Sequence, residues 1–315
     1  MFADKLTEKI MSTGNPTVAG LDPRIEYLPE CIVKEAVGLY GKSLKACGYA
    51  IKTFNKQVID TLCGIVPAIK PQFAYYELYG VEGMSALFET VSYAKEKGML
   101  VIGDAKRNDI GSTAKAYSDA YLGRVDLFGE LKPVMDIDAL TVNPYLGIDG
   151  IKPFLEDCIK YGKGIFVLVK TSNPSSGQLQ DLISEDERIY ERMACLTAAW
   201  SEGLTGKYGY GPIGAVVGAT YPEQAKRIRE LIPNGYILVP GYGAQGGTAK
   251  DCLPSFKKDG TGAIINASRS LVFAYKTARW ASSYNGENYL EIIREEAIRM
   301  KKEIQDAFAE QNAGE

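Results

Sequence analysis

Short apolar runs rich in β-branched residues alternate with longer amphipathic stretches along this chain. Several of the runs are nearly continuous, which is typical of strands buried on both faces of a parallel sheet. We predict eight strands, at Val18–Leu21, Ala68–Gln72, Leu100–Asp104, Ala139–Asn143, Ile165–Lys170, Ile213–Ala219, Tyr236–Pro240 and Gly262–Ala267.

The stretches between these runs carry apolar residues at helical spacing and are mostly long enough for a helix that crosses between parallel strands. Gly98 and Gly162 are expected just beyond the ends of two of these helices. The predicted helices are Ile32–Leu62, Val81–Lys97, Thr113–Leu122, Ile151–Tyr161, Glu185–Tyr208, Pro222–Leu231, Thr248–Phe256 and Tyr289–Phe308.

Eight successive β-α units predict an α/β fold of the (β/α)8 TIM-barrel class, as a single domain over residues 1–315 with a C-terminal helical tail. The alternative is an open doubly wound sheet, although the glycines are too dispersed for a dinucleotide fingerprint. Ser172–Leu182 is polar and lies between a strand and a helix, so we expect a mobile loop over a site.

Composition narrows the classes of partner. The 315 residues are 46% hydrophobic with a net charge of −3 and no basic block, which argues against a nucleic-acid partner. No run is apolar and uncharged for long enough to span a membrane, and the charged N-terminus does not resemble a secretory signal. Six scattered cysteines without a C-x-x-C pair indicate reduced thiols and a cytoplasmic location.

The chain contains no histidine. This absence excludes Ser-His and Cys-His nucleophile systems, histidine-ligated metals and histidine acid–base catalysis. The cysteine spacing also argues against a zinc-thiolate site. Any proton chemistry falls to Lys, Asp, Glu, Tyr or Cys.

Charged residues collect where the predicted strands end, which is the face of a barrel that carries the active site. Lys70 lies on the second strand, and Asp104, Lys106 and Asp109 follow the third. Asp104 and Lys106, at i and i+2, would point the same way on a strand. A surface ion pair or a structural network would explain them, but alternating lysines and aspartates at a cavity mouth also suit an active site.

Two further strand ends predict a phosphate site. Pro240–Gly247 is rich in glycine, so backbone N–H groups can approach an anion, and a helix N-terminus follows. Arg269, after the eighth strand, offers a planar set of donors for phosphate oxygens. The structural alternatives are a flexible turn and a surface ion pair.

For three other polar residues at strand ends the sequence predicts a function less specifically. Lys170 has the position of a Schiff-base lysine, but we favour a structural role. Asp22 beside Pro23 could merely form a turn, and Ser172 could cap a helix or loop instead of contacting a substrate.

With these residues placed, the chain resembles the orotidine 5′-phosphate decarboxylase family, in its longer-chain branch, over essentially the whole barrel. Asp104–Thr113 is similar to the family signature D-x-K-x-x-D-I-x-x-T. Pro240–Gly247 resembles its phosphate-gripping loop, and Asn266–Ser270 its terminal phosphate segment. Residues 32–62 and 175–210 are longer than in compact members.

The resemblance implies decarboxylation of orotidine 5′-phosphate to UMP, the last step of pyrimidine synthesis, without metal or cofactor. It implies that Lys106 donates a proton to C6, that Asp104 lies against the substrate carboxylate, and that Asp109 and Thr113 act across the interface of a homodimer with shared sites. The implied catalytic residues are Lys106, Asp104, Lys70 and Asp109, and the implied substrate-binding residues are Asp22, Thr113, Ser172, Pro240, Gln245, Gly246, Ser268 and Arg269.

Two alternative functions remain open. A phosphate-binding barrel with a D-x-K element could act on a sugar phosphate through an enediolate and Mg²⁺. A barrel of this kind could also bind a nucleotide without catalysis.

Overall fold

The computed structural model describes residues 1–243 and 246–314 and contains a closed barrel of eight parallel strands. The strands neighbour one another in chain order, and the last pairs with the first. They are β1 (Thr17–Leu21), β2 (Ala68–Pro71), β3 (Leu100–Arg107), β6 (Ala139–Val142), β7 (Gly164–Lys170), β10 (Ile213–Val217), β11 (Ile237–Val239) and β12 (Ala263–Ala267). All eight predicted strands and the (β/α)8 class are confirmed, with ends that differ by three residues at most.

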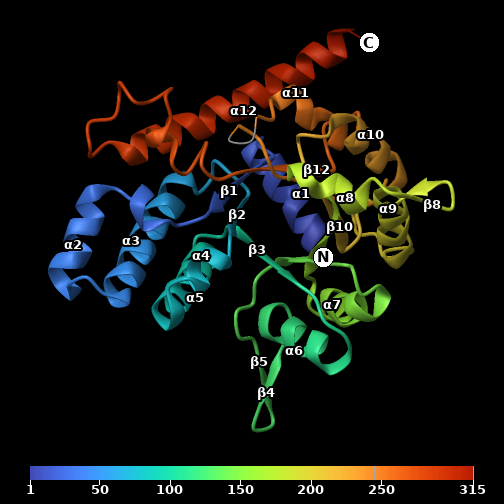
Figure 1. Ribbon diagram of the computed structural model, residues 1–315, viewed down its shortest axis with the longest axis horizontal. Coiled ribbons are helices and arrows are strands. Elements are labelled where there is room, and N and C mark those ends of the chain that lie inside the picture. The colour runs from blue at the N-terminus through green and yellow to red at the C-terminus, as the bar shows by residue number, and fades with distance from the viewer. Residues whose placement is uncertain (244–245, 315) are drawn as a thin grey trace.

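Helices surround the barrel and two short hairpins extend from it (Figure 1). The hairpins are β4–β5 (Val125–Leu127 and Glu130–Lys132) and β8–β9 (Ile183–Ser184 and Glu187–Arg188). The helices are α1 (Phe2–Thr13), α2 (Glu30–Tyr40), α3 (Leu44–Leu62), α4 (Ala74–Glu77), α5 (Gly80–Glu96), α6 (Gly111–Tyr121), α7 (Ile148–Tyr161), α8 (Gly177–Gln180), α9 (Ile189–Trp200), α10 (Pro222–Leu231), α11 (Ala249–Cys252) and α12 (Tyr289–Gly314). Four 3-10 turns complete the elements, η1 (Ile25–Tyr27), η2 (Pro174–Ser176), η3 (Leu253–Ser255) and η4 (Ala274–Lys276).

Strand alternation divides the core into two layers. Residues such as Val18, Ala68 and Ile102 point into the barrel, where helix α1 adds Phe2 and Leu6 to the same apolar cluster. Their neighbours point outward and pack beneath the surrounding helices. Helix α12 belongs to this outer layer, because Ile293 and other residues along it are buried in the same cluster.

Four of the predicted helices are wrong in extent. Helix α12 continues to Gly314, the stretch 248–256 is α11 followed by η3, and two longer stretches are interrupted. The stretch 32–62 forms two helices, α2 and α3, because Gly41 takes a positive φ of 64° and the Ser43 hydroxyl caps α3 by accepting from the Ala46 N–H. The stretch 185–208 is helical only in α9. It begins in the β8–β9 hairpin and ends in turns. In both regions apolar spacing continues across a break in the backbone.

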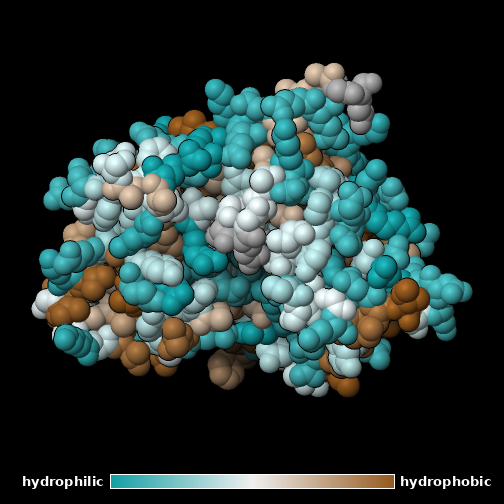
Figure 2. All heavy atoms as spheres, turned by 45° about the horizontal axis from the view of Figure 1, so that its top comes forward, coloured by the Kyte–Doolittle hydropathy of each residue, from teal (hydrophilic) through white to brown (hydrophobic). Residues whose placement is uncertain are grey.

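No helix in the described residues is long and apolar enough to cross a bilayer. The face seen in Figure 2 is hydrophilic over most of its area, and apolar side chains gather mainly toward its left and right margins.

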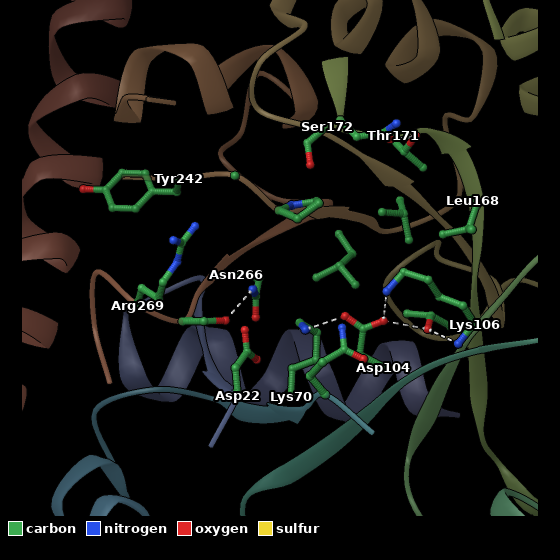
Figure 3. Close-up of a pocket in the computed structure, with 18 residues that line it drawn as sticks. Asp22, Lys70, Asp104, Lys106, Leu168, Thr171, Ser172, Tyr242, Asn266 and Arg269 are labelled. Carbon is green, nitrogen blue, oxygen red and sulfur yellow. Dashed lines mark hydrogen bonds and ion pairs between the residues drawn. The ribbon is translucent and has the colours of Figure 1, made fainter. Parts of the chain in front are cut away.

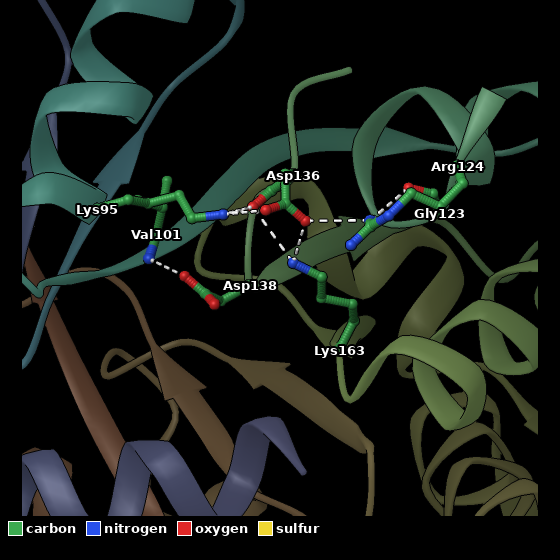
Figure 4. Close-up of polar contacts among 7 residues, drawn as sticks. All are labelled: Lys95, Val101, Gly123, Arg124, Asp136, Asp138 and Lys163. Atoms are coloured by element: carbon green, nitrogen blue, oxygen red, sulfur yellow. Dashed lines mark hydrogen bonds and ion pairs between the residues drawn. The ribbon is translucent and has the colours of Figure 1, made fainter. Parts of the chain in front are cut away.

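A cluster of charged side chains lies at the end of the barrel where the strands begin (Figure 4). The Asp136 carboxylate, just before β6, pairs with Lys95 at the end of α5, with Arg124 after α6 and with Lys163 before β7. Burial opposes the charge on Asp136, but Lys163 and Lys95 outweigh it and lower its pKa to about 2. The Asp136 carboxylate therefore holds together three segments that are far apart in the sequence.

We expect Asp136→Asn to lower the free energy of unfolding by roughly 2 kcal/mol at pH 7. The folded pKa of about 2 lies below the ordinary value of 3.8, so the stabilisation is complete above the ordinary value and is lost as pH falls through the folded one. Urea unfolding of the two proteins between pH 7 and pH 2 should give curves that converge at low pH. A difference that did not depend on pH would contradict the electrostatic account.

Candidate active site

One buried carboxylate organises the cavity at the carboxyl ends of the strands. Asp104 Oδ2 accepts from Lys70 Nζ at 2.6 Å, and its Oδ1 accepts from Lys106 Nζ at 2.5 Å and from Thr141 Oγ1 at 3.0 Å (Figure 3). The side chains of Lys70 and Asp104 are 4% and 11% exposed, whereas that of Lys106 is 45% exposed. The least enclosed of the three is therefore the one available to a ligand.

Strand alternation explains how Lys70 and Asp104 meet. Ala68 and Ile102 lie in the barrel interior, so Lys70 and Asp104, two residues further along β2 and β3, point into it as well. β2 and β3 pair directly, with Ala68 opposite Leu100. The two charged groups thus form the next layer above the apolar filling.

Lys106 reaches Asp104 by a different route from the one expected. The register between β3 and β6 shifts between Gly103 and Arg107, and Lys106 has a positive φ of 50°. Such bulges re-aim side chains, and left-handed backbone at a non-glycine residue is held in place by its surroundings. The Thr141 hydroxyl supplies part of that support by accepting from the backbone N–H groups of Ala105 and Lys106.

The charges of this array stabilise one another. Burial opposes ionisation of Asp104, but Lys70 and Lys106 outweigh it and hold the pKa of that carboxyl well below its usual range. Burial likewise opposes the Lys70 ammonium, yet Asp104 and Asp22 raise its pKa above the ordinary value. At neutral pH Lys70 is therefore an ammonium group beside an ionised Asp104 carboxylate.

The middle of the cavity contains polar atoms without partners. Asp22 Oδ1 and Asn266 Oδ1 are buried and accept no hydrogen bond. Burial raises the pKa of Asp22. Buried polar groups are normally hydrogen-bonded, and both residues line the same cavity, so the two oxygens suit a ligand with donor groups, such as hydroxyls.

Arg269 marks the other end of the cavity, opposite Lys106, with Asp22 and Asn266 between them (Figure 3). Within the described residues its guanidinium makes no ion pair or side-chain hydrogen bond. Ser268 lies beside it in the same lining, and Gly20 leaves room for that hydroxyl because a Cβ there would come within 2.0 Å of Ser268 Oγ. An unpaired guanidinium in a cavity indicates an anionic ligand.

The glycine-rich segment lies beside Arg269. Pro240, Gly241 and Tyr242 line the cavity, while Gly246 is exposed and closes the turn by donating to the Gly243 carbonyl. Gln245 lies outside the described residues. Helix α11, which follows, is only four residues long and is already capped by Thr248 and Asp251. Anion contacts from this side would therefore come from the loop itself.

The cavity has a volume of about 460 Å³, within the range of small-molecule sites. Of the predicted site residues it contains Asp22, Lys70, Asp104, Lys106, Ser172, Pro240, Ser268 and Arg269. Asp109 and Thr113 are not among its lining residues. The Asp109 carboxylate accepts from its neighbouring Ile110 N–H, and Thr113 is exposed on α6.

The Ser172 loop contains more structure than expected. Ser172 points into the cavity, and η2 and α8 follow it. Fully buried Lys170 fixes the position of η2 and α8, because its ammonium pairs with Asp181 at 2.7 Å and donates to Ser176. Lys170 does not line the cavity, which supports the structural role favoured for it over a Schiff base.

Sequence reasoning missed several lining residues. Thr141 could have been found, since it follows inward-facing Ala139 by two positions on β6. Gly241, Tyr242 and Asn266 lie within the predicted phosphate segments and Asn173 within the predicted loop, but none of the four was named as a site residue. The lining residues outside those segments are Gln72, Leu168, Thr171, Val216 and Leu238. Among the described residues no group of three or more Cys, Asp or Glu side chains is arranged to hold a metal ion.

Comparisons with known proteins agree with this geometry. Residues 50–284 match the model of the orotidine 5′-phosphate decarboxylase / HUMPS family. The chain is 44% identical to an orotidine 5′-phosphate decarboxylase of Rhodopirellula baltica, over 96% of this chain and 98% of that one. It is also 44% identical to one from Caldicellulosiruptor saccharolyticus, over 87% and 90% of the two chains.

A solved structure gives the same result. The Leishmania donovani OMP decarboxylase superposes with a TM-score of 0.71 at 30% identity, covering 98% of each chain. Sequence identity and shared architecture extend over the whole barrel and its cavity, and the family match covers the barrel from residue 50 onward. This chain belongs to the orotidine 5′-phosphate decarboxylase family.

Proposed function

We propose that this protein decarboxylates orotidine 5′-phosphate to UMP, using the cavity described above without metal or cofactor. The observation that carries the proposal is the order of groups along the cavity. A guanidinium with no ion-pair partner among the described residues lies at one end. Two oxygens with no donor among those residues lie in the middle, and a Lys-Asp-Lys array lies at the other end. In orotidine 5′-phosphate, the phosphate, the ribose and the carboxylated pyrimidine follow one another in the same order.

The array supplies the chemistry. When CO2 leaves C6, the bonding electron pair stays on that carbon, and its orbital lies in the ring plane where the π system cannot delocalise it. The Lys106 ammonium stabilises this charge and then transfers its proton to C6, after which the amine regains a proton from water. Asp104 holds the ammonium in place, and its own charge disfavours a second carboxylate beside it.

The remaining residues bind and orient the substrate. Arg269, with Ser268, Pro240, Gly246 and Gln245, holds the phosphate in this proposal. Asp22 and Lys70 hold the ribose, and Ser172 meets the edge of the pyrimidine. Binding energy from the distant phosphate can then be used to order the array around C6.

We further propose a homodimer in which Asp109 and Thr113 complete the partner's site. Neither residue lines its own chain's cavity. The segments that follow β2, β3 and β6 also expose apolar side chains, among them Val81 at the start of α5, Ile110 just before α6 and Tyr145 after β6. Exposed large apolar side chains on these segments suit a protein–protein interface.

Mixing two inactive variants tests the shared site. Lys106→Ala and Asp109→Ala subunits should each be nearly inactive, but a heterodimer would contain one site with an intact lysine and an intact aspartate. Random exchange makes half of the dimers heterodimers, so about a quarter of wild-type activity should return. No recovery, despite subunit exchange shown by mass spectrometry, would assign Asp109 to its own chain's site.

A rival Mg²⁺-dependent sugar-phosphate activity predicts a different response to chelation. We expect full activity on orotidine 5′-phosphate after dialysis against EDTA, because two ammonium groups provide the positive charge that a metal would supply. Activity that fell with EDTA and returned with Mg²⁺ would favour the rival.

We also propose a cytoplasmic location. All six cysteines are free, two of them exposed, which suits a reducing compartment.

A further inference from the structure

Tyr242 lies in the glycine-rich loop and lines the cavity, yet its hydroxyl faces away from it (Figure 3). The hydroxyl donates to Glu303 Oε2 at 2.9 Å, and Glu303 lies on the C-terminal helix α12. Tyr242 is 4% exposed, so the ring is buried between the loop and the helix. A segment more than fifty residues downstream thus contacts the loop directly.

Glu303 is itself held by a chain of polar contacts along α12. Arg299 donates to Glu303 at 2.5 Å and, through two other nitrogens, to Glu296 at 2.8 and 2.7 Å. Glu296 is 3% exposed and also accepts from Trp280 Nε1 at 2.9 Å. Two carboxylates therefore share one guanidinium, and the neutral donors Tyr242 and Trp280 complete their hydrogen bonding.

The two sides of the Tyr242–Glu303 contact differ in how firmly they are fixed. Helix α12 is packed into the core through buried Ile293, Met300 and Ile304. The described part of the loop contains four glycines, at 241, 243, 246 and 247. A glycine backbone changes conformation easily, and fixing it in one conformation costs more entropy than fixing other residues. Tyr242 is the one large side chain in that part of the loop, so its attachment sets where the backbone lies.

We propose that Glu303 is a positioning residue for phosphate binding, which through Tyr242 holds residues 241–243 beside Arg269. The inference rests on the function proposed above and extends it to α12, which lies beyond the family match at residues 50–284. The C-terminal helix thereby pre-organises the phosphate end of the cavity, which saves the cost of ordering the loop when substrate binds.

The test compares binding of UMP and uridine by calorimetry. We expect Glu303→Ala to weaken UMP binding about tenfold and to leave uridine binding unchanged, since only UMP carries the phosphate. Glu303→Gln, which keeps an oxygen for the Tyr242 hydroxyl, should recover most of the affinity. Glu310→Ala is the matched control, because Glu310 lies on the same helix and, among the described residues, pairs with exposed Lys250.

Tyr242→Phe provides an independent arm. It removes the same hydrogen bond from the other side, so it should reproduce the effect of Glu303→Ala, and the double variant should lose no more than either single one. Equal loss for UMP and uridine, or wild-type UMP affinity in both single variants, would overturn the inference. Failure of the proposed function would show separately, as a wild-type protein that does not prefer UMP to uridine.

Discussion

Lys106→Ala is expected to lower kcat about 10⁴-fold or more while UMP still binds. The substitution removes both the cation that stabilises the developing charge at C6 and the proton that C6 receives, and each contribution alone is worth orders of magnitude in rate. The Lys106 side chain is 45% exposed, and Asp104 keeps its bond to Lys70, so the fold should survive. Steady-state kinetics and UMP titration measure the two effects.

The matched control is Lys34→Ala, which removes an exposed lysine that pairs with Glu30 on α2. This variant should match the wild type in rate and affinity. Near-normal turnover of Lys106→Ala would rule out its role as proton donor. Loss of UMP binding together with turnover would instead indicate that the lysine mainly shapes the cavity.

Arg269→Ala should reduce kcat/KM for orotidine 5′-phosphate by roughly 10² to 10³, with little change for the nucleoside orotidine. The guanidinium makes no ion pair or side-chain hydrogen bond within the described residues, so its removal breaks no such contact there. What is lost is a charge-assisted contact with the phosphate, worth roughly 2–4 kcal/mol. Comparing both substrates separates phosphate binding from chemistry at C6.

Arg279→Ala is the control, since Arg279 is exposed ten residues further along and does not line the cavity. It should leave both substrates unaffected. Equal losses on the phosphorylated and unphosphorylated substrates in Arg269→Ala would argue against a phosphate role for this residue.

The barrel was predictable because each strand is an apolar run that cannot be mistaken for a surface helix. The errors have local causes. Helical spacing continues across Gly41, although a positive φ breaks the helix there. The two-residue strands of the β8–β9 hairpin are too short to show a period of two, so the sequence pattern predicts a helix through this region.

The charged end of the cavity was predictable for a related reason. Lys70, Asp104 and Lys106 interrupt or follow apolar runs, and parallel strands bring such ends together. Thr141 was less visible, because a threonine inside an apolar strand looks like a packing residue. Lys106 contacts Asp104 because strand β3 has a bulge, and the simple alternation of side chains along a strand does not predict a bulge.

Other parts of the site depend on contacts that no local pattern encodes. Tyr242 and Glu303 meet only because α12 packs against the barrel beside the phosphate loop. Asp109 and Thr113 do not line their own chain's cavity, so their proposed role requires a second copy of the chain.

The most direct test of the central claim is the ultraviolet absorbance of orotidine 5′-phosphate after the purified protein is added. The account predicts a steady loss of absorbance, with UMP and CO2 formed in equal amounts and with no added metal or cofactor. Unchanged absorbance, with the substrate bound but recovered intact, would contradict it and would leave a barrel that binds a nucleotide without catalysis.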